Sequence, residues 1–405
     1  MGRALETLTP EMFRNGIPLA ELGRLRAEEP IFQMVLPDGT PAWNLVRYAD
    51  VAEGLRDVQR YATPNPDAQV RFGQAAIGPD QLDAWSLHAM ILLNAPVHGP
   101  YRQQFTGLMK RDLLEQFRER VRAVAERTVR EARALGYADG VEHCAAPAST
   151  AFVCDYLRIV PENRDYVRRL AAVFMGDTLP PVGVGSVGAT ALGPNAVRGA
   201  HGSPGRAAMD LIGESWGHAP WLDPKLVENA GRWEIEDLGL QMLAAGVAGV
   251  RNCLVYAITL LAPLWRQVQS NPDEWLGKLP AVADEVIRHA SPLLRSRRIL
   301  KDNISLYGQR MAEGDTVLLW LVGANFDERK FSNPHSFQPF RFPNPHVSFG
   351  GGVHHCLGAP LARLEVEEFL RAMILGWKSI EILEAPVRFA SNVVNEVSAL
   401  PIRVA

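Results

Sequence analysis

A glycine-rich run that contains one cysteine constrains this chain more than any other feature. The run spans residues 349–358 and has the sequence Phe-Gly-Gly-Gly-Val-His-His-Cys-Leu-Gly. The residues after Cys356, from Leu357 to Arg363, predict the start of a helix. A helix N-terminus supplies free N–H groups and the positive end of a dipole, and both favour a thiolate over a thiol. The glycines allow the backbone to pass close to a large, flat group.

A thiolate held in this way is a suitable ligand for a soft or redox-active metal ion. No second cysteine or histidine stands at the spacing of a zinc or iron–sulfur site. A single axial ligand to haem iron is therefore the favoured interpretation. The alternative is a structural cysteine buried in a glycine-rich turn.

The run is similar to the haem-binding loop of the cytochrome P450 family, which has the pattern Phe-Gly-x-Gly-x-(His/Arg)-x-Cys-Leu-Gly. The matching positions are Phe349, Gly350, Gly352, His354, Cys356, Leu357 and Gly358. The resemblance implies a mainly α fold with a small β part, shaped as a triangular prism, in one domain over residues 1–405. The β-rich part would lie near residues 25–60, 295–322 and 385–405. Haem b would lie between a long central helix and the helix after Cys356.

Composition and charge exclude several classes of protein. Hydrophobic residues make up 47% of the chain and charged residues 21%, which is typical of a globular protein. The net charge of -3 gives no reason to expect a nucleic acid partner. The first 20 residues carry charges and lack an apolar core, so we expect neither a signal peptide nor a membrane anchor, and a cytoplasmic protein. Cys144, Cys154 and Cys253 are too scattered for a disulfide framework and are expected in the core.

Several segments before the cysteine loop have recognisable patterns. Residues 31–36 and 42–46 are two β-prone runs around Pro-Asp-Gly, which predicts a hairpin. Residues 113–135 have the apolar stripe of an amphipathic helix. Residues 176–205 are rich in glycine and proline, and they are either a surface loop or, as in the family, a lid over the substrate entrance. Residues 387–404 predict a C-terminal hairpin.

Residues 234–266 predict a long helix that is buried on all sides, because it is apolar almost throughout. Gly246 and Gly249 each cost about 1 kcal/mol relative to alanine in a helix, and close packing against a flat cofactor is one reason to keep them. The family has Ala-Gly-x-(Glu/Asp)-Thr here. Ala245 and Gly246 match, but Ala248 replaces the acid and Gly249 the threonine. Neither Ala248 nor Gly249 can steer protons during O–O bond cleavage, so these are atypical catalytic positions.

The resemblance also implies roles for other residues. His98 and Arg102 are four apart and share one face of a helix, where the family binds haem propionates. Arg298, or Arg297 if the alignment slips by one residue, would bind a propionate as well, together with His354. Phe349 and Gly358 would contact the haem. Glu285, Arg288 and Arg341 match a buried Glu–Arg–Arg network that holds the segment leading to Cys356.

The family uses O2 and two electrons from NAD(P)H, delivered by a ferredoxin and its reductase. The chain contains no flavin or iron–sulfur motif of its own. We expect docking on a basic face that includes Arg111 and Arg363. Residues 62–95 would form the loop over the distal face of the haem.

The substrate positions are expected at Gln69, Met242, Ala245, Gly246, Gly249, Leu293 and Asn392. Small residues leave room above the iron, and the amides of Gln69, Asn392 and Asn395 offer hydrogen bonds without charge. We therefore expect a natural product of secondary metabolism, neutral and aromatic or amide-bearing. Family members without the acid–alcohol pair perform coupling or ring closure, so oxidative C–C or C–N coupling, for example of an indole diketopiperazine, is the first hypothesis. Ordinary hydroxylation is the second, and a non-catalytic haem-binding protein is the alternative from another class.

Overall fold

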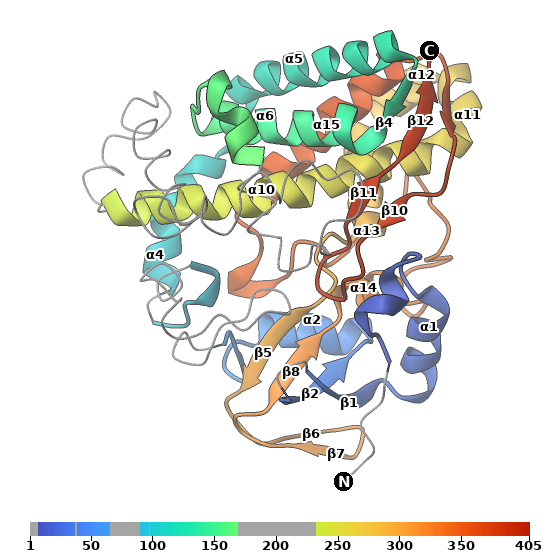
Figure 1. Ribbon diagram of the computed structural model, residues 1–405. Coiled ribbons are helices and arrows are strands. Elements are labelled where there is room, and N and C mark those ends of the chain that lie inside the picture. Colours follow the sequence, from blue (N-terminus) through green and yellow to red (C-terminus); the bar gives the residue numbers. More distant parts are fainter. Residues whose placement is uncertain (1–6, 37–38, 65–89, 97, 169–231) are drawn as a thin grey trace.

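The computed structural model describes residues 7–36, 39–64, 90–96, 98–168 and 232–405, and its architecture is mainly helical with a small β part (Figure 1). Gln69 and residues 176–205 lie outside the described residues. Long helices form one side of the molecule and the largest sheet lies on the other. The mainly α class expected from the sequence is confirmed.

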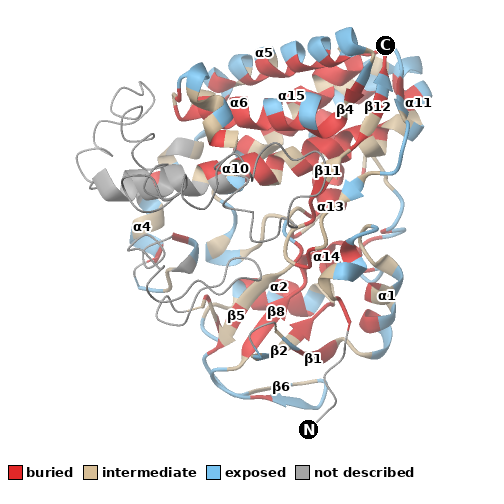
Figure 2. Cartoon of the chain, in the orientation of Figure 1, coloured by how far each residue is buried: buried red, intermediate tan, exposed pale blue. Residues whose placement is uncertain are grey.

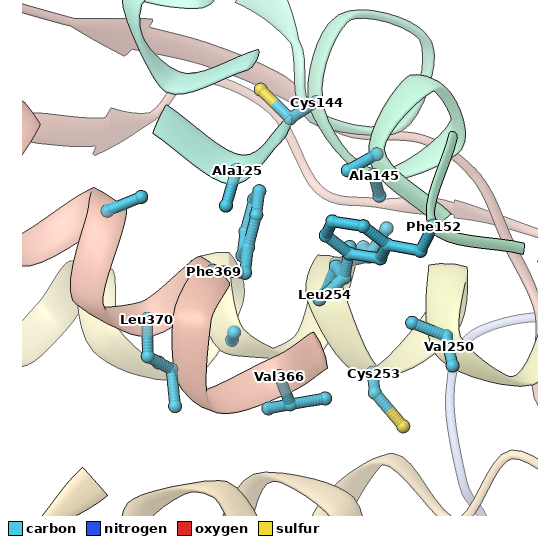
Figure 3. Packing of buried hydrophobic residues seen from close by; sticks show 14 of the residues in the cluster. Ala125, Cys144, Ala145, Phe152, Val250, Cys253, Leu254, Val366, Phe369 and Leu370 are labelled. Atoms are coloured by element: carbon cyan, nitrogen blue, oxygen red, sulfur yellow. The ribbon is translucent and has the colours of Figure 1, made fainter. Parts of the chain in front are cut away.

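The helical side is built around α10, which packs against α6, α13 and α15, while α5 covers α6 and α15. Side chains from these helices form the main core, in which Phe152, Leu254 and Phe369 meet (Figure 3). The bounds are α4 His98–Phe105, α5 Arg111–Leu135, α6 Ala146–Tyr156, α10 Arg232–Leu261, α13 Leu279–Ala290 and α15 Ala359–Gly376. The shorter helices are α1 Leu19–Glu28, α2 Tyr48–Arg56, α11 Trp265–Ser270, α12 Pro272–Gly277 and α14 Leu321–Asn325.

The β part contains a five-stranded sheet of order β1-β2-β8-β5-β3. Its strands are β1 Ile31–Val35, β2 Pro41–Leu45, β3 Tyr61–Ala62, β5 Ser296–Leu300 and β8 Thr316–Leu319. The hairpin predicted over residues 31–46 is present, with Ile31 opposite Leu45. The parallel pairing of β2 with β8 brings distant parts of the chain into one sheet, because these strands lie more than 270 residues apart.

The smaller sheets include the C-terminal strands of the chain. They contain β4 Tyr137–Asp139, β6 Ile304–Leu306, β7 Gln309–Met311, β9 Ile380–Ile382, β10 Val387–Arg388, β11 Val397–Ala399 and β12 Pro401–Val404. The predicted hairpin over residues 387–404 is only partly correct. β10 pairs with β11, but β12 turns away and pairs with β4 and β9.

The amphipathic helix predicted over residues 113–135 is α5. Its apolar stripe, which includes Phe117, Val121 and Val129, is buried, and its outer face is exposed (Figure 2). The helix ends where Gly136 adopts a φ of 72°, a left-handed conformation that glycine adopts without strain.

The expectation that the long central helix is buried on all sides was wrong. α10 ends at Leu261, because Pro263 lacks the N–H needed to continue the helix and residues 262–264 form a 3-10 turn. Ala245, near the middle of α10, is exposed, while Val247 and Val250 are buried. Among the described residues, the segment Ala245–Ser270 has the length and apolar character needed to cross a membrane. Because 61% of its most apolar window is buried, it resembles the core helix of a globular protein.

Candidate active site

The loop that carries Cys356 is fixed by its own backbone. The N–H of Cys356 donates to the carbonyl of Phe349 at 2.8 Å, and the N–H of His355 donates to the carbonyl of Gly352 at 3.1 Å. Gly350 and Gly352 adopt φ values of 70° and 62°, which favour glycine. The loop therefore folds back on itself and presents Cys356 directly before α15.

Two of the glycines in this loop allow a close approach to another part of the protein. A Cβ on Gly352 would stand 2.7 Å from the carbonyl oxygen of Leu55 and 2.9 Å from the Cα of Arg56. A Cβ on Gly351 would stand 3.3 Å from the Cβ of Leu55. These glycines therefore seat the loop on the end of α2.

The pKa of the Cys356 thiol is raised above its ordinary value. Although Cys356 is exposed at the surface of the loop, desolvation of its sulfur by surrounding protein is the largest cause, and it outweighs the hydrogen bonds from the N–H groups of Gly358 and Ala359 and the positive charge of Arg102. The N–H groups at the start of α15 lower the pKa of the thiol, as expected, but they do not offset its desolvation. Coordination of a metal ion deprotonates a thiol outright, so haem iron would supply the missing stabilisation.

Four basic side chains predicted from distant parts of the sequence come together beside this loop. The rings of His98 and His354 lie 4.2 Å apart, centroid to centroid. Arg102 donates to the carbonyl of His355 at 2.6 Å. The pKa of His354 falls to about 3, first because the ring is buried and then because His98, Arg298 and Arg102 place positive charge near it.

Arg298 is the arginine of β5 that points to this cluster. It is 5% exposed, its Nε has no partner, and burial lowers its pKa to about 10. Successive residues of a strand point to opposite faces, and Arg297 lies on the other face, where it donates to the hydroxyl of Thr316 at 3.1 Å.

The cluster fits the propionates of haem. Within the described part of the chain, no carboxylate forms an ion pair with His98, Arg102, Arg298 or His354. A buried cation without a counter-charge, such as Arg298, is unfavourable, and a carboxylate supplied by a ligand would remove that cost. Beside Cys356, this donor set suits an iron porphyrin with an axial thiolate.

Glu285, Arg288 and Arg341 form the buried network predicted from the sequence. Glu285 accepts from Arg288 at 2.7 and 2.8 Å and from Arg341 at 3.1 Å. Burial alone would raise the pKa of Glu285, but the hydrogen bonds and positive charge around it hold the pKa well below its usual range. Arg288 also donates to the carbonyls of Asn325 and Pro334, so the network anchors the segment that precedes the cysteine loop.

Asn325 is a functional residue that the sequence analysis missed. Its side chain accepts from the N–H of Val347 at 2.8 Å and donates to the hydroxyls of Ser291 and Ser348. Through these bonds it joins the end of α13 to the residues just before Phe349. A buried asparagine at the end of a short helix was the available signal, but its partners lie up to 34 residues away.

The glycines of α10 have different surroundings. A Cβ on Gly246 would stand 2.9 Å from the Cγ2 of Val153 on α6, so this glycine allows the two helices to pack closely. A Cβ on Gly249 would meet nothing within 4 Å. Ala245 and Gly249 are therefore the small residues that border open space, and Ala248 is 8% exposed.

Two other substrate predictions fall on described residues near the C-terminal segment. Leu293 is 40% exposed and forms an isolated bridge with Val394. Asn392 is buried, and its amide donates to the carbonyl of Leu8, which links the C-terminal segment to the N-terminal one. Asn395 is similarly occupied, because its amide donates to Tyr256 and to the carbonyl of Ala290.

Met242 is half-buried against the core.

Phe349 is covered by Arg363, whose guanidinium carbon lies 4.6 Å from the ring centroid. The same guanidinium donates to Asp284 at 2.7 Å. Arg363 is therefore held within the protein, while Arg111, at the start of α5, is exposed.

Comparisons with known proteins agree with this site. Residues 275–381, which contain Glu285, Arg288, Arg341 and Cys356, match the family model for cytochrome P450. The chain is 26% identical over 408 residues to a steroid C26-monooxygenase of Mycolicibacterium smegmatis, covering 94% of this chain and 88% of the relative. It is 29% identical over 363 residues to a 20-oxo-5-O-mycaminosyltylactone 23-monooxygenase of Streptomyces fradiae, covering 88% and 82%.

The fold is also that of solved cytochromes P450. The chain superposes on P450BioI, crystallised with an acyl carrier protein ligated to hexadec-9Z-enoic acid, with a TM-score of 0.81 and 21% identity over 98% of this chain and 100% of the other. The family takes its electrons from redox partners and oxidises small molecules with a thiolate-ligated haem and O2. The match over residues 275–381 and the similarity over nearly the whole chain support a cytochrome P450, an oxidoreductase of the monooxygenase type.

Proposed function

We propose that this enzyme joins two positions of a neutral aromatic substrate by oxidative C–C or C–N coupling or cyclisation, with an indole diketopiperazine as the model substrate. The observation that carries the proposal is the pair Ala248 and Gly249, which stand where the family has an acid and an alcohol. Ala245 and Gly249 border open space with apolar or absent side chains. Because Asn392 and Asn395 bond within the protein, we propose that the pocket selects for shape and apolar surface more than for amide groups.

Electrons and protons balance in the proposed reaction. Two substrate X–H bonds break and one C–C or C–N bond forms, which releases two electrons and two protons. Two further electrons come from NAD(P)H, two further protons come from solvent, and O2 is reduced to two molecules of water. No oxygen atom enters the product.

Each part of the site has a role in this reaction. When bound, haem supplies the activation of O2, and an axial thiolate favours O–O cleavage. Cys356 would hold the iron, and His98, Arg102, Arg298 and His354 would bind the propionates through charge-assisted hydrogen bonds. Glu285, Arg288 and Arg341 would keep the segment before Cys356 in place.

Product analysis tests the proposal. The holoenzyme is supplied with NADPH, a surrogate ferredoxin with its reductase, and a tryptophan-containing cyclodipeptide under ¹⁸O2. We expect a product that has lost two hydrogens for each bond formed and contains no ¹⁸O. A product that contains one ¹⁸O atom for each turnover contradicts coupling.

Hydroxylation is the second candidate, and the comparisons favour it. Both relatives described above carry the names of monooxygenases. In that reaction one C–H bond becomes C–OH, two electrons come from NAD(P)H, and one molecule of water forms. The experiment with ¹⁸O2 separates the two reactions.

We propose that a ferredoxin is the redox partner and that the enzyme acts in the cytoplasm as a single domain in natural-product biosynthesis. The exposed Arg111 supports a basic docking face. Replacement of Arg111 by glutamate should raise the KM for ferredoxin and leave substrate binding unchanged. If the KM for ferredoxin is unaffected, the docking face lies elsewhere.

A further inference from the structure

One buried side chain of α10 has no hydrogen-bond partner on either polar atom. Asn252 is 3% exposed, and both its Nδ2 and its Oδ1 are unpaired. The other buried asparagines of the described residues are Asn44, Asn325, Asn392 and Asn395, and the amide of each is hydrogen bonded. Burying an amide with neither atom paired is unfavourable, so each such case in a native protein requires an explanation.

The position of Asn252 on the helix supplies that explanation. Asn252 lies three residues after Gly249 and four after Ala248, so the three share one face of α10. Seven residues before it, on the same face, Ala245 is exposed. Next to it, Gly249 has free space where a side chain would stand. An amide that needs both a donor and an acceptor therefore adjoins room for a small polar molecule.

A water molecule suits this place. Buried waters typically bond to polar groups that lack protein partners, and they can both accept from an amide N–H and donate to an amide oxygen. The same turn of the helix is the one from which the acid and the alcohol are missing. Thr259, one further position on this face, cannot take their role, because its hydroxyl already donates to the carbonyl of Val255 at 2.9 Å.

We propose that Asn252 is a positioning residue that holds an ordered water beside Ala248 and Gly249, and that this water carries protons to the reacting oxygen in place of the acid–alcohol pair. The proposal rests on the assigned monooxygenase-type chemistry and applies equally to coupling and hydroxylation. Reduction of O2 by two electrons and two protons yields hydrogen peroxide. Reduction by four electrons and four protons yields two waters, and it requires protons at the stage when the O–O bond breaks.

The share of peroxide tests the proposal without an organic substrate. The holoenzyme receives NADPH through a surrogate ferredoxin and its reductase, and hydrogen peroxide is measured per NADPH consumed. We expect Asn252→Leu to move this ratio toward one and to lower the water-forming rate on the order of tenfold to a hundredfold. Thr259→Val is the matched control on the same face and should leave the ratio unchanged.

A second variant tests whether the peroxide ratio of Asn252→Leu can be restored. Because a Cβ fits at position 249, Gly249→Thr in the Asn252→Leu background restores a hydroxyl to this turn, and we expect the peroxide ratio to return toward the original value. A merely structural role of Asn252 would not respond to a hydroxyl one turn away.

Thermal unfolding gives a readout that does not depend on turnover. If a water satisfies the amide, Asn252→Leu leaves the Tm unchanged or lowers it. If the amide is unpaired, removing it raises the Tm by a few degrees. An unchanged peroxide ratio or a raised Tm overturns the proposal. Neither result depends on whether the cyclodipeptide is coupled, so the two proposals fail separately.

Discussion

His98 and His354 stand 256 residues apart in the sequence, yet their rings lie 4.2 Å apart, and Arg102 and Arg298 are near enough to lower the pKa of His354. Neither histidine forms an ion pair with a carboxylate in the described part of the chain. Four basic groups thus converge where the protein supplies no counter-charge. This arrangement is typical of a site that is completed by an anionic ligand.

Removing Arg298 should weaken haem binding while sparing the fold. A hydrogen bond to a charged group contributes about 1.5–3 kcal/mol, so Arg298→Met should increase the rate of haem transfer to an excess of apomyoglobin by about tenfold to a hundredfold. Arg297→Met, on the opposite face of β5, is the matched control. Equal haem loss from both variants would mean that neither arginine is specific for the propionates.

Cys356→Ala should abolish thiolate ligation. The reduced protein treated with carbon monoxide should lose the red-shifted Soret band of the thiolate complex, because no other described cysteine is accessible: Cys144, Cys154 and Cys253 are all buried. Cys253→Ala is the control and should keep the band. Persistence of the band in Cys356→Ala would remove the basis of the whole site.

Glu285→Gln should be among the most destabilising single substitutions outside the core. It leaves Arg288 and Arg341 buried without a counter-charge, which costs about 3–5 kcal/mol. Glu274→Gln breaks the exposed pair with Lys278 and should cost less than about 1 kcal/mol. Chemical denaturation measures both. Similar losses in the two variants would contradict the role assigned to the buried network.

The same carboxylate predicts a pH dependence. The pKa of Glu285 is depressed in the folded state, so its stabilising effect is complete above the pKa of an unfolded glutamate and is lost as the pH falls toward the folded value. The free energy of unfolding should therefore fall on the acid side. Glu285→Gln should flatten that limb and leave the curve above neutral pH parallel to the original.

Gly246 and Gly249, one turn apart on α10, should differ in how replacement by alanine changes the stability of the protein. Alanine is favoured over glycine inside a helix by about 1 kcal/mol. Gly249→Ala should gain most of this, because a Cβ there meets nothing within 4 Å. Gly246→Ala should lose stability, because its Cβ would lie 2.9 Å from Val153. Val153→Ala should rescue Gly246→Ala, and a failure to rescue would place the strain elsewhere.

The fold class and the four residues of the basic cluster beside Cys356 could be predicted from the sequence. The motifs around Cys356, His98 and Glu285 are local patterns with fixed spacing, so a resemblance carries them over directly. Contacts between residues far apart in the sequence could not be predicted in this way. Asn392 was expected to face substrate because it stands near the tip of a loop, but its amide bonds to Leu8, 384 residues away. Likewise, nothing local distinguishes Gly246 from Gly249, since only α6 determines which one is crowded.

The seating of Gly351 and Gly352 on Leu55 and Arg56 has a consequence for biosynthesis. The loop around Cys356 rests on the end of α2, Tyr48–Arg56, near the start of the chain. During translation, some 300 further residues follow that helix before Cys356 is added. We therefore expect a porphyrin to bind only after nearly the whole polypeptide has been translated, because the cysteine loop and the helix on which it rests lie far apart in the sequence.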